Sequence, residues 1–213
     1  MKLNVRTLLA LFGCAALLAA APVANADPIP YPDPGAPAAF TQLNAVATGE
    51  ITGYFYSSNA GDTDLIEMVD ITTGTTSGLF FNNQTSHPGD VADFGHVNAG
   101  DLIAFVLVDQ SKGVNYSSDP TVPFMNTDHT NHAYITAFGG PGDPSAGNPG
   151  TIPAGTYVGF EDRFNPPSDL DYNDDNFVFT NLVATQTPEP SSIILLGSGL
   201  LGMAGLVRRR MGL

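Results

Sequence analysis

The sequence predicts an all-β fold, a single antiparallel β-sandwich or jelly-roll-like domain. Short runs rich in β-branched and aromatic residues recur between clusters of Gly, Asn, Asp and Pro, a pattern typical of antiparallel strands joined by turns. Helix signals are almost absent between these runs. One run, 102–108, is continuously apolar, which predicts a central strand covered on both faces.

The predicted domain covers residues 41–187 and follows a proline-rich, extended lead-in at 27–40. A length of roughly 150 residues is enough to bury one core. Phe177 and Phe179 share one face of the last run, and Leu182 or Val183 is expected to join the core beyond them. The expected strands are 45–56, 65–71, 79–81, 101–108, 133–138, 156–160 and 176–184.

The first 26 residues are typical of a secretory signal peptide that forms an apolar helix before removal. Lys2 and Arg6 precede an apolar run, and the small residues Ala24-Asn25-Ala26 follow it, which predicts cleavage after Ala26. An uncleaved membrane anchor is the alternative, but the apolar run is short for a span. Cys14, the single cysteine, lies inside this segment. The exported protein is therefore expected to have no disulfide.

The C-terminal segment, 188–213, combines three features in order. The motif Pro188, Glu189, Pro190 precedes an apolar stretch at 191–207, which Arg208, Arg209 and Arg210 follow. The stretch predicts a short transmembrane helix whose arginine end stays in the cytoplasm. This arrangement resembles the PEP-CTERM sorting signal. The resemblance implies that the export machinery and an exosortase process the chain, which is anchored in the membrane until then and ends at the cell surface or in an extracellular matrix. A plain tail anchor is the alternative.

The charge distribution of the predicted domain is strongly negative. Lys112 and Arg163 are its basic residues, whereas of the 21 acidic residues of the chain all but Glu189 lie between Asp27 and Thr187. Such a field repels nucleic acid and attracts cations. Nucleic-acid binding is therefore excluded, and a divalent metal is the favoured partner.

The densest acidic segment lies just before the last predicted strand. Its oxygen-bearing residues alternate with Leu170 and Tyr172, so that in extended backbone they share one side. Ca²⁺ binds six to eight such oxygen atoms, but Asp174 and Thr180 stand where an EF-hand loop needs glycine and glutamate. We therefore expect a Ca²⁺ site of another type. An Asx-rich turn without metal and a catalytic carboxylate pair are the alternatives. The candidate ligands are Glu161, Asp162, Asp169, Asp171, Asn173 and Asp174.

The same segment resembles a domain of unknown function found in PEP-CTERM proteins and bacterial adhesins. The matching motifs are Gly159-Phe160-Glu161-Asp162 and Asp169-Leu170-Asp171-Tyr172-Asn173-Asp174, with an upstream Asp128-His129 or His132 element. The sequence departs from the family pattern at Pro166-Pro167 and at Asp175. The resemblance implies a surface location and a Ca²⁺ site, and it implies no reaction.

Two weaker candidates accompany this segment. Asp62 and Asp64 are interpreted as a solvated turn, with a second cation site as the alternative. His129 and His132 lack the further ligands of a zinc motif, so one of them is expected to hydrogen-bond the acidic segment, with zinc as the alternative.

Two functional hypotheses follow. The first is a non-catalytic, Ca²⁺-stabilised surface protein in adhesion, biofilm or exopolysaccharide association, whose partners are extracellular polysaccharide or other surface proteins. The second is an exported hydrolase that cleaves surface polysaccharide with two carboxylates. The absence of tryptophan, the usual sugar platform, from the chain favours the first hypothesis.

Overall fold

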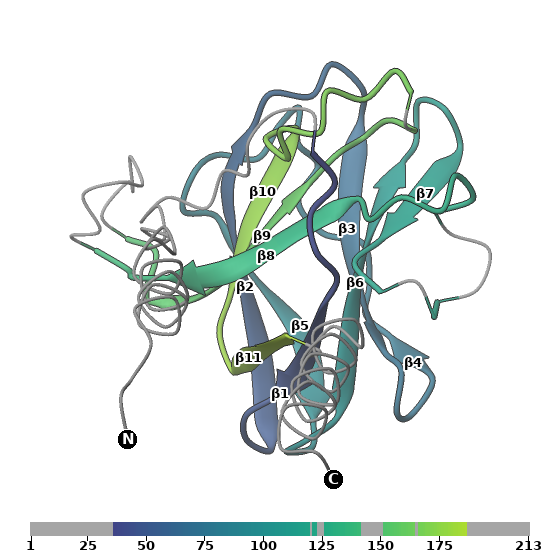
Figure 1. Cartoon of the computed structure of the whole chain (residues 1–213). Helices are drawn as coiled ribbons and strands as arrows, with labels where there is room; N and C mark the ends of the chain where they lie inside the picture. The colour runs from purple at the N-terminus through teal and green to yellow at the C-terminus, as the bar shows by residue number, and fades with distance from the viewer. Residues whose placement is uncertain (1–35, 120, 123–125, 142–150, 165, 187–213) are drawn as a thin grey trace, which may run out of the picture.

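The computed structural model describes residues 36–119, 121–122, 126–141, 151–164 and 166–186 (Figure 1). Within these residues the fold is all-β and consists of two antiparallel sheets. The predicted signal peptide at 1–26, most of the lead-in and the tail at 188–213 lie outside the described residues. In the part that the structure describes, no helix has the length and apolar character needed to cross a membrane.

The first sheet is built around β6, which pairs with β1, β3 and β7. Residues on both faces of β6 are buried, among them Ala104 and Phe105, so the prediction of a central, doubly covered strand is confirmed. At the edge, β1 pairs with β11 from Thr41↔Gln186 to Ala45↔Leu182. The order of the main path is β11 (Leu182–Gln186), β1 (Thr41–Ala45), β6 (Leu102–Asp109), β3 (Asp64–Asp70) and β4 (Thr75–Thr76), and β7 (Val114–Ser117) lies beside β6.

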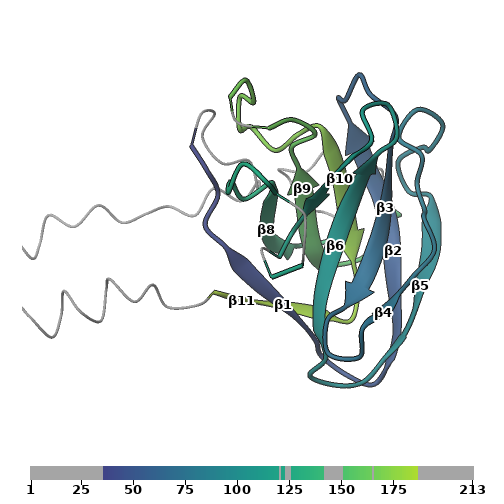
Figure 2. The same cartoon turned by 90° about the vertical axis from the view of Figure 1, so that its right-hand side faces the viewer.

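The second sheet places its neighbouring strands β9 and β10 next to the candidate site. Strand β10 is central and pairs with β2 and β9, and β9 also pairs with β8. The strand order is β5 (Val91–Val97), β2 (Gly49–Ser58), β10 (Asp175–Phe179), β9 (Gly155–Phe160) and β8 (Ala133–Phe138). Figure 2 shows this sheet behind β3 and β6 of the first sheet.

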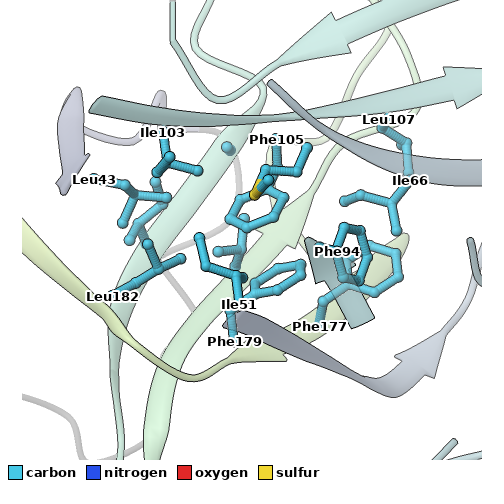
Figure 3. Close-up of a cluster of buried hydrophobic side chains, with 14 of the residues drawn as sticks. Leu43, Ile51, Ile66, Phe94, Ile103, Phe105, Leu107, Phe177, Phe179 and Leu182 are labelled. Atoms are coloured by element: carbon cyan, nitrogen blue, oxygen red, sulfur yellow. The ribbon is translucent and has the colours of Figure 1, made fainter. Parts of the chain in front are cut away.

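The core lies between the two sheets, which gives the fold its sandwich-like form (Figure 3). Phe105 of β6 stacks on Phe179 of β10, with ring centroids 3.7 Å apart. Phe94 of β5 meets both rings edge-on. Gly53 of β2 makes room for this cluster, because a Cβ atom there would lie 2.4 Å from the Phe94 ring. Phe177 and Phe179 both belong to this core, as predicted, and Leu182 joins it while Val183 is exposed.

Two predicted strands are each divided in the structure. The run 45–56 contains the end of β1 and most of β2, and the run 176–184 contains most of β10 and the start of β11. The chain crosses from one sheet to the other at both breaks, between β1 and β2 and between β10 and β11. At the second break, Asn181 has a left-handed φ of 63°. Its carbonyl accepts from the Val46 N–H at 3.0 Å and its side chain accepts from the Ala47 N–H at 2.9 Å.

The remaining predicted strands agree with the structure to different degrees. The structure has β8 at the predicted residues 133–138, but 79–81 contributes only an isolated bridge between Ile66 and Phe80. Strands β4, β5 and β7 and most of β1 were not predicted. Residues 91–97 and 114–117 contain Gly, Asn, Asp or Ser, which weakens their β-propensity, and sheet pairing overrides that weakness.

Candidate metal centre

The candidate ligands lie in the connection between β9 and β10. These neighbouring antiparallel strands pair from Thr156↔Phe179 to Phe160↔Asp175, so the connection leaves and re-enters the sheet at one end. Glu161 and Asp162 follow β9 directly, and the other predicted ligands lead into β10. All six residues are therefore held near one end of the sandwich.

Three carboxylates of this connection converge. Glu161, Asp169 and Asp171 each offer an oxygen atom, and these atoms lie within 4.8 Å of one another. Glu161 is fully buried, whereas Asp169 is exposed. We call these residues the outer trio. Three carboxylate ligands with an exposed side, where water completes the shell, are a ligand set that Ca²⁺ accepts.

The Glu161 carboxylate is oriented by the loop that folds over it. The Ser168 hydroxyl donates a hydrogen bond to Oε2, and the Tyr172 backbone N–H donates one to Oε1. Burial raises the pKa of Glu161 above its ordinary value; these two hydrogen bonds lower it, and the charges of Asp169 and Asp171 raise it. A cation among the three would favour the ionised form of each.

The loop reaches this position because apolar residues alternate with the acidic ones. Leu170 and Tyr172 are buried, whereas Asp169 is exposed and Asp171 is half-buried, so the burial alternates as predicted. The backbone is not extended as predicted, because Leu170 and Tyr172 have left-handed φ values of 56° and 54°. The Tyr172 hydroxyl donates to the Asn131 carbonyl at 2.7 Å and accepts from the Ala38 N–H at 2.8 Å. Gly159 allows the close approach, because a Cβ atom there would lie 2.5 Å from the Tyr172 carbonyl oxygen.

Two predicted ligands orient the loop and are not part of the trio. Asn173 donates from its side-chain amide to Asp171 Oδ2, and it accepts a hydrogen bond from Asn59 at 3.2 Å. Asp174 Oδ2 accepts from the Asp162 backbone N–H at 3.0 Å. Burial raises the pKa of Asp174 to about 7, with a further increase from the Asp162 and Glu161 charges.

The sixth predicted ligand, Asp162, points to the other side of the sheet. Successive side chains of an extended chain alternate between faces. The carboxylate of Asp162 is 1% exposed and accepts no hydrogen bond from the described residues, although the Arg163 Nε lies 3.5 Å from its Oδ1. The side chains predicted to form one site therefore divide between two faces of the sheet.

The histidines differ in their relation to this loop. His132 is fully buried, with Nδ1 3.3 Å from the Glu161 carbonyl oxygen and Nε2 3.1 Å from the Asp128 carboxylate. The predicted contact between a histidine and the acidic segment is thus made by His132 to the backbone. His129 lies in a turn with a φ of 61°. Asp64, predicted in a solvated turn, is only 1% exposed, so that interpretation is wrong.

An open pocket of about 470 Å³ lies beside the loop. Its wall includes Lys112 and Arg163, which are the basic residues of the described part of the chain. Sequence reasoning missed this pocket because its walls come from the β6–β7 connection, β7 and the β9–β10 connection, which are distant in sequence. The complete lining is Lys112, Val114, Tyr116, Arg163, Phe164, Pro166 and Pro167.

The end of the chain matches a known sorting signal. The family model described as the PEP-CTERM protein-sorting motif matches residues 186–210. The motif supports an exported protein that an exosortase processes, anchored in the membrane before processing and located at the cell surface. Comparisons with the curated proteins and with the solved structures give no match.

Proposed function

We propose that the protein is a non-catalytic surface or extracellular-matrix protein whose β-domain is stabilised by Ca²⁺ and associates with exopolysaccharide in adhesion or biofilm formation. The PEP-CTERM motif supports the surface location. The convergence of Glu161, Asp169 and Asp171 within 4.8 Å carries the proposal for calcium. The resemblance of the loop to a domain of unknown function found in PEP-CTERM proteins and bacterial adhesins agrees with a Ca²⁺-binding surface protein.

Calcium at the outer trio would hold the β9–β10 connection against the sheet. Glu161 is fixed at the end of β9, whereas Asp169 and Asp171 belong to the loop, so one ion would tie the loop to the strand. The ion would also offset the repulsion between three carboxylates. Because it binds the native state, it would raise the free energy of unfolding by an amount that grows with the logarithm of the Ca²⁺ concentration relative to its Kd.

The test compares thermal unfolding of the full chain, purified in mild detergent, with Ca²⁺ and with excess chelator. The wild-type midpoint should be several degrees higher with Ca²⁺, and Glu161→Gln should abolish most of that difference. Glu50→Gln is the matched control, because Glu50 is an exposed residue of β2 that pairs with His96 and contributes nothing to the trio. A midpoint that does not respond to chelator would refute calcium stabilisation.

Association with polysaccharide is supported by the pocket beside the loop. Lys112 and Arg163 supply positive charge, and Phe164 supplies an aromatic surface beside them. This combination suits a sugar ring that carries a carboxylate, because the guanidinium group binds carboxylates and the ring packs on apolar sugar faces. Retention on an alginate column, with dextran as the neutral control, tests the association. Arg163→Gln should reduce retention on alginate, and equal retention on both columns would contradict it.

The alternative of a polysaccharide hydrolase has less support. The described pocket has no carboxylate in its lining. Burial raises the pKa of Asp64 to about 7, as a general acid would need, but a side chain that is 1% exposed does not reach a glycan. Cleavage of a surface glycan by the wild type and its loss in Asp171→Asn would favour the hydrolase over the proposal.

A further inference from the structure

Four aspartates continue the inward-facing rows of side chains beyond the apolar core. Asp64 precedes Ile66 on β3, and Asp109 follows Leu107 on β6, in each case two residues along the strand. On the second sheet, Asp162 follows Phe160 and Asp175 precedes Phe177 with the same spacing. Because alternate residues share a face, all four occupy positions that face the space between the sheets. We call them the inner aspartates.

The inner aspartates lie at the same end of the sandwich. Asp64 and Asp109 are register partners at the start of β3 and the end of β6. Asp175 begins β10 opposite Phe160, the last residue of β9, and Asp162 follows two residues later. The charges of Asp64 and Asp175 act on each other, although their strands belong to different sheets.

These carboxylates are buried without sufficient partners. Their exposures are 1% for Asp64, 0% for Asp109, 1% for Asp162 and 0% for Asp175. A buried charge is costly unless hydrogen bonds or counter-charges compensate for it. The oxygens that accept no hydrogen bond from the described residues are Asp64 Oδ1, Asp109 Oδ2, both of Asp162 and both of Asp175.

The nearby basic residues compensate for only part of this charge. Lys112 Nζ lies 3.5 Å from Asp109 Oδ2 and also contacts Asp62, and Arg163 Nε lies 3.5 Å from Asp162 Oδ1. Both side chains are largely at the surface, with exposures of 42% and 56%. Each positive charge is therefore shared with solvent, and within the described residues neither basic residue forms an ion pair with Asp64 or Asp175.

We propose that the inner aspartates bind a divalent cation, Ca²⁺, which joins the two sheets. The donors are all carboxylate oxygens, which hard cations prefer. Asp64 and Asp109 would bind from the first sheet, and Asp162 and Asp175 from the second. This site is distinct from the outer trio, because Glu161 and Asp162 point to opposite faces of the sheet.

Lys112 competes with the ion for this site. The inner aspartates are spaced more widely than the outer trio, and the Lys112 ammonium lies at the side of Asp109. Entry of a divalent cation draws the carboxylates together and displaces the ammonium towards Asp62, which it already contacts. Lys112 therefore acts as the internal counter-ion in the absence of metal.

The deciding experiment is unfolding of full-length Asp175→Asn with Ca²⁺ and with chelator. Without metal, and at a pH high enough to ionise the inner aspartates, the variant should melt higher than the wild type, because it loses a buried, uncompensated charge. With Ca²⁺ it should melt lower, because it loses a ligand. Asp70→Asn is the matched control: Asp70 is buried at the opposite end of β3 and accepts from the Thr73 N–H at 3.0 Å. Its effect should have the same sign in both conditions. If Asp175→Asn raises the midpoint in both conditions, or lowers it in both, the inner site does not bind calcium.

Titration calorimetry with Ca²⁺ separates this inference from the proposed outer site. The wild type should bind two equivalents, and Asp175→Asn and Glu161→Gln should each bind one. Two equivalents in Asp175→Asn would refute the inner site. A single wild-type equivalent lost in Glu161→Gln would refute the inner site and leave the outer one. A single equivalent lost only in Asp175→Asn would refute the outer site and support the inner one. Circular dichroism checks folding, and Asp109→Asn replaces Asp175→Asn if that variant does not fold.

Discussion

Glu161 and Asp162 are adjacent in the chain, yet their carboxylates serve opposite faces of the second sheet. Glu161 meets Asp169 and Asp171 beneath the loop, whereas Asp162 lies among the inner aspartates, where its charge adds to burial and to the charge of Asp109 in raising the pKa of Asp64. The end of β9 thus contributes to both candidate sites. A shift of this strand end would move ligands of both the outer trio and the inner aspartates. We therefore expect Ca²⁺ binding at one site to affect Ca²⁺ binding at the other.

Gly159→Ala should disturb the outer trio. The added Cβ atom would lie 2.5 Å from the Tyr172 carbonyl oxygen, so the loop that carries Asp169 and Asp171 must move away from β9. Overpacking of this kind costs about 1–3 kcal/mol of unfolding free energy. Gly61→Ala is the control, since nothing lies within 4 Å of a Cβ atom there. Calorimetry should show weaker Ca²⁺ binding for Gly159→Ala only, and unchanged binding would contradict the assigned role of the loop.

Stability in chelator should fall as the pH rises from about 5 to about 8. Burial raises the folded-state pKa of Asp64 and Asp174 from 3.8 to about 7, so the folded protein binds protons that the unfolded chain has released. The stabilisation is complete below the unfolded pKa and is lost as the pH passes the folded one, at about 1.4 kcal/mol per pH unit for one such group. The groups that face Asp64 are Asp62, Asp109, Asp162 and Asp175, and those that face Asp174 are Glu161, Asp162 and Asp171.

Saturating Ca²⁺ should reduce this pH dependence, because the bound ion favours the ionised carboxylates. Denaturant unfolding at a series of pH values, with chelator and with Ca²⁺, provides the measurement. A metal-free protein whose stability rises steadily across the same range would show that these carboxyl groups are not raised in pKa.

Lys112→Met should have opposite effects on stability and on calcium affinity. In chelator the variant should melt lower, because Asp109 loses its nearby ammonium group. Its Ca²⁺ affinity at the inner site should increase severalfold, because the competing charge is gone. Lys112→Arg, which keeps the charge, is the control. Weaker calcium binding by Lys112→Met in calorimetry would show that Lys112 does not compete with the ion.

Phe179→Ala should cost about 3–5 kcal/mol of unfolding free energy. Its ring is fully buried and stacks on Phe105 of the opposite sheet at an interplanar angle of 15°. Val183→Ala, at a position 44% exposed, should change stability by less than about 0.5 kcal/mol. Denaturant melts of both variants test the difference, and a small loss for Phe179→Ala would place the core elsewhere.

Much of the local structure could be predicted from side-chain patterns. The shared face of Phe177 and Phe179 follows from the period of two in extended chains, and the continuous apolar run of β6 follows from burial on both faces. The crossings between sheets could not be predicted in this way. The turn at Asn181 depends on hydrogen bonds to Val46 and Ala47, which are distant in the sequence.

The position of the inner aspartates also depends on contacts between residues that are distant in the sequence. Each lies two residues from an inward-facing apolar side chain, as in Asp64-Leu65-Ile66 and Asp175-Asn176-Phe177, and that spacing is visible in the sequence. The run of β6 is apolar on both faces, so its sequence does not reveal that Asp109 faces inward. Nor does it reveal that four strand ends from two sheets meet at one place, because that depends on topology.

The pairing of Thr41 with Gln186 determines how the domain would carry mechanical load. Gln186 is the last described residue before the sorting tail, and β11 lies at the edge of its sheet with β1 as its neighbour. Tension applied through the tail acts first on the Thr41–Gln186 pair, and the residue pairs between β1 and β11 then separate one at a time. Separating the pairs in sequence needs less force than breaking all hydrogen bonds between β1 and β11 at once. We therefore expect β11 to detach under a force that leaves the remaining strands intact.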